Sequence, residues 1–133
     1  MKHGTLQALT ERGIQPSAQR MAVAEYVLYT TDHPSADQVW SKVKRGFPML
    51  SRATVYNTLN LFAQRGLLRP LTVGMGKTCF DSNVSAHFHF QDEQTGSLID
   101  LPLPDVQFAR LPPPPPGMEV AGIELLIRVR KRP

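Results

Sequence analysis

Two histidines separated by a single residue, His87 and His89, have the spacing in this sequence that best suits metal chemistry. In a β-strand, residues i and i+2 lie on one face about 7 Å apart between Cα atoms, so two such imidazoles can bind one ion. Asp100 lies eleven residues after His89, and a turn at Gln94 to Gly96 would return the chain so that Asp100 lies beside both histidines. The pattern predicts a metal site on a two-stranded hairpin.

Two further donors extend this candidate site. Asp81 lies six residues before His87, and His33 lies in the loop that precedes a predicted helix. If that loop folds against the hairpin, three imidazoles and two carboxylates meet, a mixture that suits Fe(II), Mn(II) or Zn(II). A surface strand that carries His87 and His89 without any ligand is the alternative interpretation. The cluster lies at the point in the sequence where the charge of the chain changes sign, and this position favours the metal interpretation.

The charge distribution divides the chain near residue 83. Residues 1–82 hold ten basic and five acidic residues, whereas residues 83–127 hold Arg110 alone against six acidic residues. A basic first part fits a polyanionic partner such as nucleic acid, although basic surfaces also keep proteins soluble. We therefore expect two domains, 1–82 and 83–133.

Length and composition exclude several classes of protein. The chain has 133 residues, of which 41% are hydrophobic and 20% charged, and no apolar run approaches the roughly 18 residues of a membrane span. The first residues do not resemble a signal peptide, so we expect a cytoplasmic protein with no membrane partner. A single cysteine, Cys79, excludes an internal disulfide and any zinc site built from several thiolates.

Four helices are predicted before any strand. Ser35 begins the third, where Gln38 completes a capping box, and Gly66 ends the fourth. The apolar residues of the third helix follow helical spacing and indicate one buried stripe. The predicted helices are Leu6–Arg12, Ser17 to about Tyr29, one that starts after Ser35 and is broken by Gly46-Phe47-Pro48, and Arg52–Gln64 with Ser51 as its cap.

The fourth predicted helix has two unlike faces. Val55, Leu59 and Phe62 point inward at helical spacing. The opposite face is polar but uncharged, unlike most solvated helix faces, and small or amide side chains suit base edges in a major groove, where Asn pairs well with adenine. This outer face consists of Ala53, Asn57, Asn60 and Gln64, with Thr54 and Tyr56 at its margins.

A hairpin follows the four helices. Leu67–Val73 and Lys77–Phe80 are predicted strands, joined by a turn at Gly74-Met75-Gly76. This order indicates a winged helix-turn-helix, with the fourth helix in the major groove and Lys77 and Arg69 near phosphates. A small helical domain that uses the hairpin only for packing is the alternative.

The second part of the chain is predicted to be mostly β-strand. Phe88–Asp92 and Ser97–Leu101 form a hairpin, and Met118–Val129 a final strand. Three short strands leave an exposed edge, for which pairing with a second copy is the expected remedy. The expected fold class is therefore α+β, an N-terminal winged helix followed by a small β-rich dimerisation domain. The prolines Pro112–Pro116 form a stiff connector or, alternatively, a ligand for an aromatic groove.

Four segments together resemble the ferric uptake regulator family of bacterial metal-responsive repressors. The resemblance runs from about Leu9 to Arg130 and is most specific in the fourth helix. It implies a homodimer that binds double-stranded operator DNA through its winged helix and is controlled by a metal at the hinge. The segments are Ala53 to Leu59, Gln19-Arg20, His33 to Asp37, and His87 to His89.

The resemblance also implies roles for individual residues. The residues His33, Asp81, His87, His89 and Asp100 fall on the iron or manganese site of the family's peroxide-regulator branch, and Tyr56 falls on a residue that touches bases. Zn(II) is expected to bind in vitro. The DNA-contacting set predicted from pattern and resemblance together is Arg20, Ser51, Arg52, Ala53, Thr54, Tyr56, Asn57, Asn60 and Lys77.

The sequence departs from the family's pattern in two respects. Asn57 stands where the family often has Arg, and the two Cys-x-x-Cys pairs of a structural zinc site are absent, which excludes that zinc. Both departures resemble the iron response regulator branch of alphaproteobacteria, whose members sense iron through haem. His87 and His89 are therefore alternative haem ligands, although Cys79 is not followed by the proline of the usual Cys-Pro haem motif.

These observations favour a regulator rather than an enzyme. We expect a homodimeric transcriptional regulator that responds to iron status through the metal site or haem. With Fe(II) bound, the resemblance implies that peroxide oxidises His33 or His87 and releases DNA. One alternative is a small metallohydrolase that uses His87, His89 and Asp100 with a bound water, for which the sequence offers no obvious general base. Another is a winged-helix DNA binder without an effector.

Overall fold

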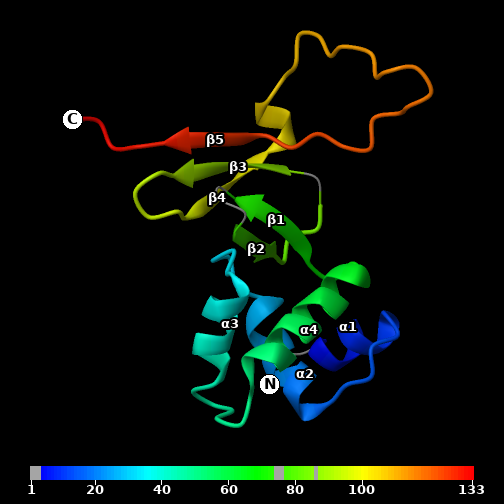
Figure 1. The fold of residues 1–133 in the computed structure, drawn as a ribbon, viewed down its shortest axis with the longest axis vertical. Helices are drawn as coiled ribbons and strands as arrows, with labels where there is room; N and C mark the ends of the chain where they lie inside the picture. The colour runs from blue at the N-terminus through cyan, green and yellow to red at the C-terminus, as the bar shows by residue number, and fades with distance from the viewer. Residues whose placement is uncertain (1–3, 74–76, 86) are drawn as a thin grey trace. The chain divides into compact units, whose positions relative to one another are not determined.

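The computed structural model describes residues 4–73, 77–85 and 87–133, and the predicted turn at residues 74–76 lies outside them. It divides into two compact units, Met1–Val84 and Ser85–Pro133. The first unit contains four helices and a two-stranded sheet, and the second contains a three-stranded sheet (Figure 1). The expected α+β class is therefore confirmed.

The order of elements in the first unit is that of a winged helix. The strands β1 and β2 pair antiparallel, with Arg69 opposite Asp81 and Val73 opposite Lys77. The predicted helices are confirmed to within one or two residues, the usual uncertainty of a helix end. The elements are α1 (Thr5–Glu11), α2 (Ala18–Val27), α3 (Ala36–Val43), α4 (Arg52–Gln64), β1 (Arg69–Val73) and β2 (Lys77–Asp81).

Serine side chains begin three of these helices. The hydroxyl of Ser17 accepts the N–H of Arg20 at 3.2 Å, and that of Ser51 accepts the N–H of Thr54 at 3.1 Å. At α3 the predicted capping box is present, because Ser35 accepts the Gln38 N–H while the Gln38 side chain accepts the Ser35 N–H. Each such cap stabilises a helix by about 1 kcal/mol, so the starting points are fixed locally.

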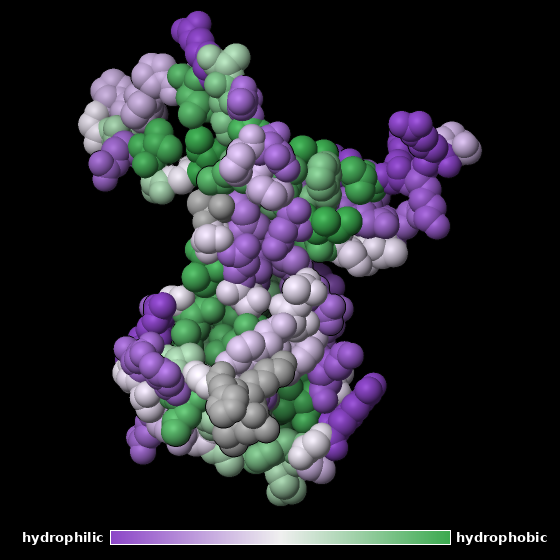
Figure 2. Space-filling view, turned by 180° about the vertical axis from the view of Figure 1, so that it is seen from behind, coloured by the Kyte–Doolittle hydropathy of each residue, from purple (hydrophilic) through white to green (hydrophobic). Residues whose placement is uncertain are grey.

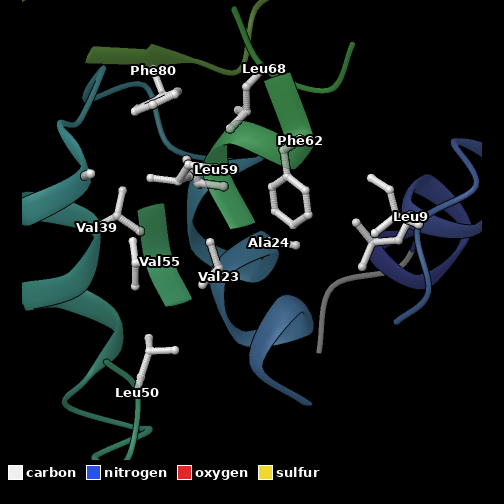
Figure 3. Close-up of a cluster of buried hydrophobic side chains, with 13 residues drawn as sticks. Leu9, Val23, Ala24, Val39, Leu50, Val55, Leu59, Phe62, Leu68 and Phe80 are labelled. Carbon is white, nitrogen blue, oxygen red and sulfur yellow. The ribbon is translucent and has the colours of Figure 1, made fainter. Parts of the chain in front are cut away.

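The core of the first unit is built around α4 (Figure 3). The inner face of α4 is fully buried, as its spacing predicted. Side chains from every other helix and from the hairpin pack against it, which fixes the rotation of α4 about its axis. The labelled core comprises Val55, Leu59 and Phe62 of α4 with Leu9, Val23, Ala24, Val39, Leu50, Leu68 and Phe80.

Two arginines join the ends of α1 and α4. The Nη1 of Arg12 donates to the carbonyl of Arg65 at 2.9 Å, and the Nη1 of Arg65 donates to the carbonyls of Arg12 at 2.8 Å and Gly13 at 3.2 Å. Arg12 and Arg65 are the C-caps of their own helices. Each cation therefore satisfies carbonyls at the negative end of the other helix.

The sheet of the second unit has the order β4-β3-β5. The strands β3 (His87–Asp92) and β4 (Leu98–Pro102) form the expected antiparallel hairpin, and a short 3₁₀ helix, η1 (Leu103–Asp105), follows β4. The predicted final strand, Met118–Val129, is wrong in length, because only β5 (Leu126–Val129) is a strand. It pairs parallel with β3, with Leu126 opposite His89. Because β3 begins at His87, residues 118–123 have no strand beside them.

Much of the surface of the second unit is hydrophobic. Figure 2 shows green side chains at the surface of this unit, and both outer strands, β4 and β5, leave one edge unpaired within the unit. Exposed apolar side chains and free strand edges are typical of interaction surfaces. The exposed large side chains are Ile99, Leu103, Phe108, Leu111, Met118, Val120, Ile123, Leu126, Ile127 and Val129.

The connection from η1 to β5 extends away from the sheet (Figure 1). It contains the five prolines Pro112–Pro116, all exposed and outside any helix or strand, in agreement with their lack of an N–H. Among the residues that the structure describes, no helix is both long and apolar enough to cross a lipid bilayer.

Gly66 tests the join between α1 and α4. Its φ is +79°, and an added Cβ would lie 2.7 Å from Nη1 of Arg12. We predict that Gly66→Ala lowers the free energy of unfolding by about 1–2 kcal/mol, measured by urea denaturation, because it adds left-handed strain and displaces the arginine. Gly46→Ala is the matched control, since its Cβ would meet nothing within 4 Å and its φ is not positive. Equal stability of the two variants would contradict this account.

Candidate metal centre and nucleic-acid interface

Three donors meet on the hairpin of the second unit. Asp100 on β4 lies opposite His89 on β3, and His87 lies two residues earlier on the same face. The Nε2 atoms of His87 and His89 each lie 3.4 Å from the same oxygen, Oδ1 of Asp100. Two donors that each lie about 2.1 Å from one ion are roughly 3.0–3.4 Å apart, depending on the coordination geometry, so the spacing fits a divalent metal.

The backbone sets the tautomer of His87. Its Nδ1 lies 2.6 Å from the carbonyl oxygen of Ser85. A carbonyl only accepts, so Nδ1 carries a proton, and in the neutral imidazole the lone pair is then on Nε2, on the side of Asp100. An N–H held by a backbone carbonyl is the usual second partner of a metal-bound histidine, because it orients the ring and increases the basicity of the ligating nitrogen.

A second pair of donors lies within the first unit. Nε2 of His33 lies 3.3 Å from Oδ2 of Asp81, and both side chains are buried. Their proximity follows from strand-like pairing: the N–H of Phe80 donates to the carbonyl of Pro34 at 2.8 Å, and Ser35 forms an isolated antiparallel bridge with Cys79. This register brings His33 opposite Asp81.

His33 has a strained backbone. Its φ is +52°, and it is the one residue other than glycine with a positive φ in the part of the chain that the structure describes. Histidine enters this region more readily than most residues, but the conformation still costs of order 1 kcal/mol or more. Such strain persists where surrounding contacts hold it, and here the neighbouring residues Pro34 and Ser35 are paired with β2.

Cys79 is a poor candidate ligand. The side chain is buried, and burial raises the pKa of its thiol, an effect that the charge of Lys77 only partly opposes. The thiolate is the form that binds metals, so the raised pKa keeps Cys79 as a thiol at neutral pH. The available donors are therefore imidazoles and carboxylates, as the sequence indicated.

The outer face of α4 has the predicted orientation. Ala53, Tyr56, Asn57 and Asn60 are exposed and Thr54 is half-buried. With the inner face fixed in the core, these uncharged side chains form the ridge of the helix. The major groove of B-DNA, roughly 12 Å wide, admits an α-helix, so this face could enter it.

A hollow lies on each side of this ridge, and each hollow contains one of the predicted DNA-contacting cations. Arg20 is held in the first hollow by a hydrogen bond from its Nη1 to the carbonyl of Gln15 at 2.9 Å. Lys77, exposed at the start of β2, lies in the second. The first is lined by Gln15, Pro16, Ser17, Gln19, Arg20, Thr54, Asn57, Thr58 and Leu61, and the second by Ser35, Ala36, Asp37, Tyr56, Asn60, Lys77, Thr78 and Phe80.

The remaining predicted contacts, Ser51 and Arg52, are exposed at the start of α4 but also have partners within the protein. Ser51 caps the helix and donates its hydroxyl to that of Thr54. The Arg52 guanidinium lies 4.5 Å from the ring centre of Trp40 and 3.9 Å from Asp37. No pattern in the sequence marks the roles of Gln15 and Trp40, since one acts through its carbonyl and the other through tertiary packing.

A winged helix with an uncharged ridge between two basic hollows defines a class of DNA-binding protein, and the imidazole–carboxylate donor group is its candidate metal site. Residues 11–111 match the model of the Ferric uptake regulator family. The chain belongs to that family and is a DNA-binding transcriptional regulator. The resemblance noted in the sequence is thus confirmed.

The chain is similar to proteins named as peroxide regulators. The peroxide operon regulator of Bacillus subtilis (strain 168) is 37% identical over 99 residues, which cover 74% of this chain and 68% of that protein. The peroxide-responsive repressor PerR of Staphylococcus aureus (strain Mu50 / ATCC 700699) is 33% identical over 102 residues, 77% of this chain and 69% of that protein. These relatives favour a regulator over the hydrolase and the effector-free alternatives.

The fold is also that of a solved regulator. A structure of a zinc-bound manganese uptake regulator superposes with a TM-score of 0.73 at 20% sequence identity, covering 96% of this chain and 98% of that chain. At this identity the comparison supports the α+β winged-helix architecture alone.

Asp100 provides a test of the donor group. We predict that Asp100→Asn weakens Mn(II) binding at least about tenfold, because it removes the carboxylate that both imidazoles face. The affinity is measured by competition with a fluorescent chelator. Asp105→Asn is the matched control, as it makes the same change at an exposed carboxylate in η1. Equal affinities of the two variants would argue against a metal role for Asp100.

Proposed function

We propose that this chain is a homodimeric, cytoplasmic repressor whose affinity for operator DNA is set by a divalent metal ion. The observation that carries the proposal is the convergence of His87 and His89 on one oxygen of Asp100. Three nitrogen and two oxygen donors, with His33 and Asp81 added, suit Fe(II) or Mn(II), and Zn(II) is expected to bind in vitro.

The ion is proposed to draw donors from both units. His33 with Asp81 supplies two protein donors and the hairpin supplies three, so neither group alone fills five coordination positions. The five residues 82–86 separate Asp81 from His87, a covalent link that spans at most about 20 Å when fully extended. An ion held by both groups would fix the orientation of the DNA-binding unit relative to the second unit, which is the effect that an allosteric ligand needs.

The arrangement of the hairpin histidines favours an ion over haem. His87 and His89 direct their Nε2 atoms at the same carboxylate oxygen, and their ring centres lie 4.5 Å apart. Two histidines that together held one haem would need room for the porphyrin between them, whereas these two nitrogens share one carboxylate oxygen. Haem at His87 and His89 is therefore the second choice, and the assay below separates it from the ion.

The outer face of α4 is proposed to read the operator. Tyr56, Asn57 and Asn60 would meet base edges in the major groove, while Arg20 and Lys77 would contact phosphates on the two sides. A dimer formed through the exposed apolar surface of the second unit would place two such helices in half-sites about one helical turn apart.

The first prediction of this proposal is a metal-dependent affinity for DNA. A duplex selected from a random-sequence library by the Mn(II)-loaded protein should bind at least about tenfold more weakly after metal removal, by fluorescence anisotropy, which is a typical allosteric coupling. Hemin added to metal-free protein should not restore the affinity. Restoration by hemin but not by Mn(II) would favour haem, and equal binding in all three states would refute effector control.

The same assay tests the peroxide response suggested by the relatives. In protein loaded anaerobically with Fe(II), hydrogen peroxide should release the duplex and add one oxygen atom to the imidazole of His33 or His87, with water as the other product. Mass spectrometry of the peptides detects the added oxygen. Release of DNA without any oxidised histidine would exclude this route.

Asn57 tests the reading of bases. We predict that Asn57→Ala reduces the preference for the selected duplex over random duplexes by about 1–3 kcal/mol, because a bidentate amide–adenine pair is lost. Affinity for random duplexes should stay unchanged. Gln64→Ala is the matched control, since it removes an exposed amide from the last residue of the same helix. An equal loss of preference in both variants would contradict the placement of Asn57 against bases in the major groove.

A further inference from the structure

The two segments that carry the metal donors of the first unit also line one of the hollows beside α4. The first segment runs from His33, a donor, to Ser35, Ala36 and Asp37 at the start of α3, and these three residues line the hollow. The second segment is β2, which carries Lys77 in the hollow and Asp81, a donor, four residues later. One pair of segments therefore serves both the metal and the DNA-facing hollow.

Backbone contacts hold these segments in a single register. Ser35 bridges to Cys79, and the Phe80 N–H donates to the carbonyl of Pro34. Ser35 is also the N-cap of α3 through its capping box with Gln38. The position of β2 is thereby tied to the first turn of α3, and a slip of one residue would turn every side chain of β2 to the other face.

The edge of β2 that faces away from β1 is held by this attachment. β1 pairs with the other edge along the whole strand, and Phe80 packs in the core around α4. The bridge to Ser35, the bond to Pro34 and the His33–Asp81 pair are the described contacts on the opposite edge of β2. Any ligand that joins His33 to Asp81 tightens that edge.

We propose that metal binding at His33 and Asp81 fixes β2 against the start of α3 and so holds Lys77 in position to contact a phosphate. The contact between Lys77 and a phosphate then depends on the bound metal. Part of the metal's effect on DNA affinity therefore arises inside the first unit. This inference rests on the proposed function. Arg20, in the other hollow, is held by Gln15 and lies on α2, so its contribution does not depend on the metal.

The inference is tested with the full chain and a random-sequence duplex at low salt, where stronger electrostatic binding is expected to make the affinity of the metal-free protein measurable. Dissociation constants are measured with and without saturating Mn(II) for the wild type, Lys77→Ala and Arg20→Ala. Lys77→Ala should weaken binding at least about threefold more with Mn(II) than without, and should lower the salt slope by about one only with Mn(II). Arg20→Ala should weaken binding by the same factor in both states.

Equal weakening by Lys77→Ala in both states would overturn the inference while leaving the proposed function intact, provided that Mn(II) still tightens wild-type binding. No effect of Mn(II) on the wild type would instead refute the proposed function. Hydrogen exchange gives an independent readout, because the Phe80 amide that donates to Pro34 should exchange more slowly with Mn(II). The Leu67 amide, which donates to Phe62 at the end of α4, should not change. Unchanged exchange at Phe80 would also overturn the inference.

Discussion

The burial of one face of α4 is the constraint on which the rest of the first unit depends. Val55, Leu59 and Phe62 are fully excluded from solvent, and burying each stabilises the fold by roughly 1.5–3 kcal/mol. Because helical residues advance by a fixed angle, fixing this face also fixes the opposite one. The exposed positions of Asn57 and Asn60 are therefore a consequence of core packing, and the orientation of the surface proposed to face DNA is set by the core beneath it.

The strand β2 connects the proposed DNA contact of the first unit with its pair of candidate metal donors. Lys77 begins it beside the outer face of α4, and Asp81 ends it beside His33. Asp81 lies four residue steps along the strand from Lys77, which is about 13 Å of extended backbone. Because both residues lie on one strand held in a single register, the proposal expects the position of Asp81 to affect that of Lys77.

Features that rest on local side-chain chemistry were predictable from the sequence. The capping box of Ser35 and Gln38 is one example, and the meeting of His89 with Asp100 is another, because counting along a hairpin gives its register. The pairing of Ser35 with Cys79 was not predictable, since no local pattern marks an isolated bridge between distant segments. The parallel pairing of β5 with β3 and the carbonyls that Arg12 and Arg65 satisfy were missed for the same reason.

In the second unit, the proposed metal site would affect the stability of the fold as well as its function. Its buried apolar side chains on the sheet are few, namely Phe88, Leu98 and Leu101, and the chain's single cysteine excludes a disulfide. Units of this size usually need a disulfide, a metal or a partner chain to be stable. A metal at the hairpin and a second copy on the exposed apolar surface, both proposed above, would each stabilise the unit. A ligand that binds only the folded state stabilises it by mass action, so an effector ion at His87, His89 and Asp100 would control how much of the unit is ordered as well as its orientation.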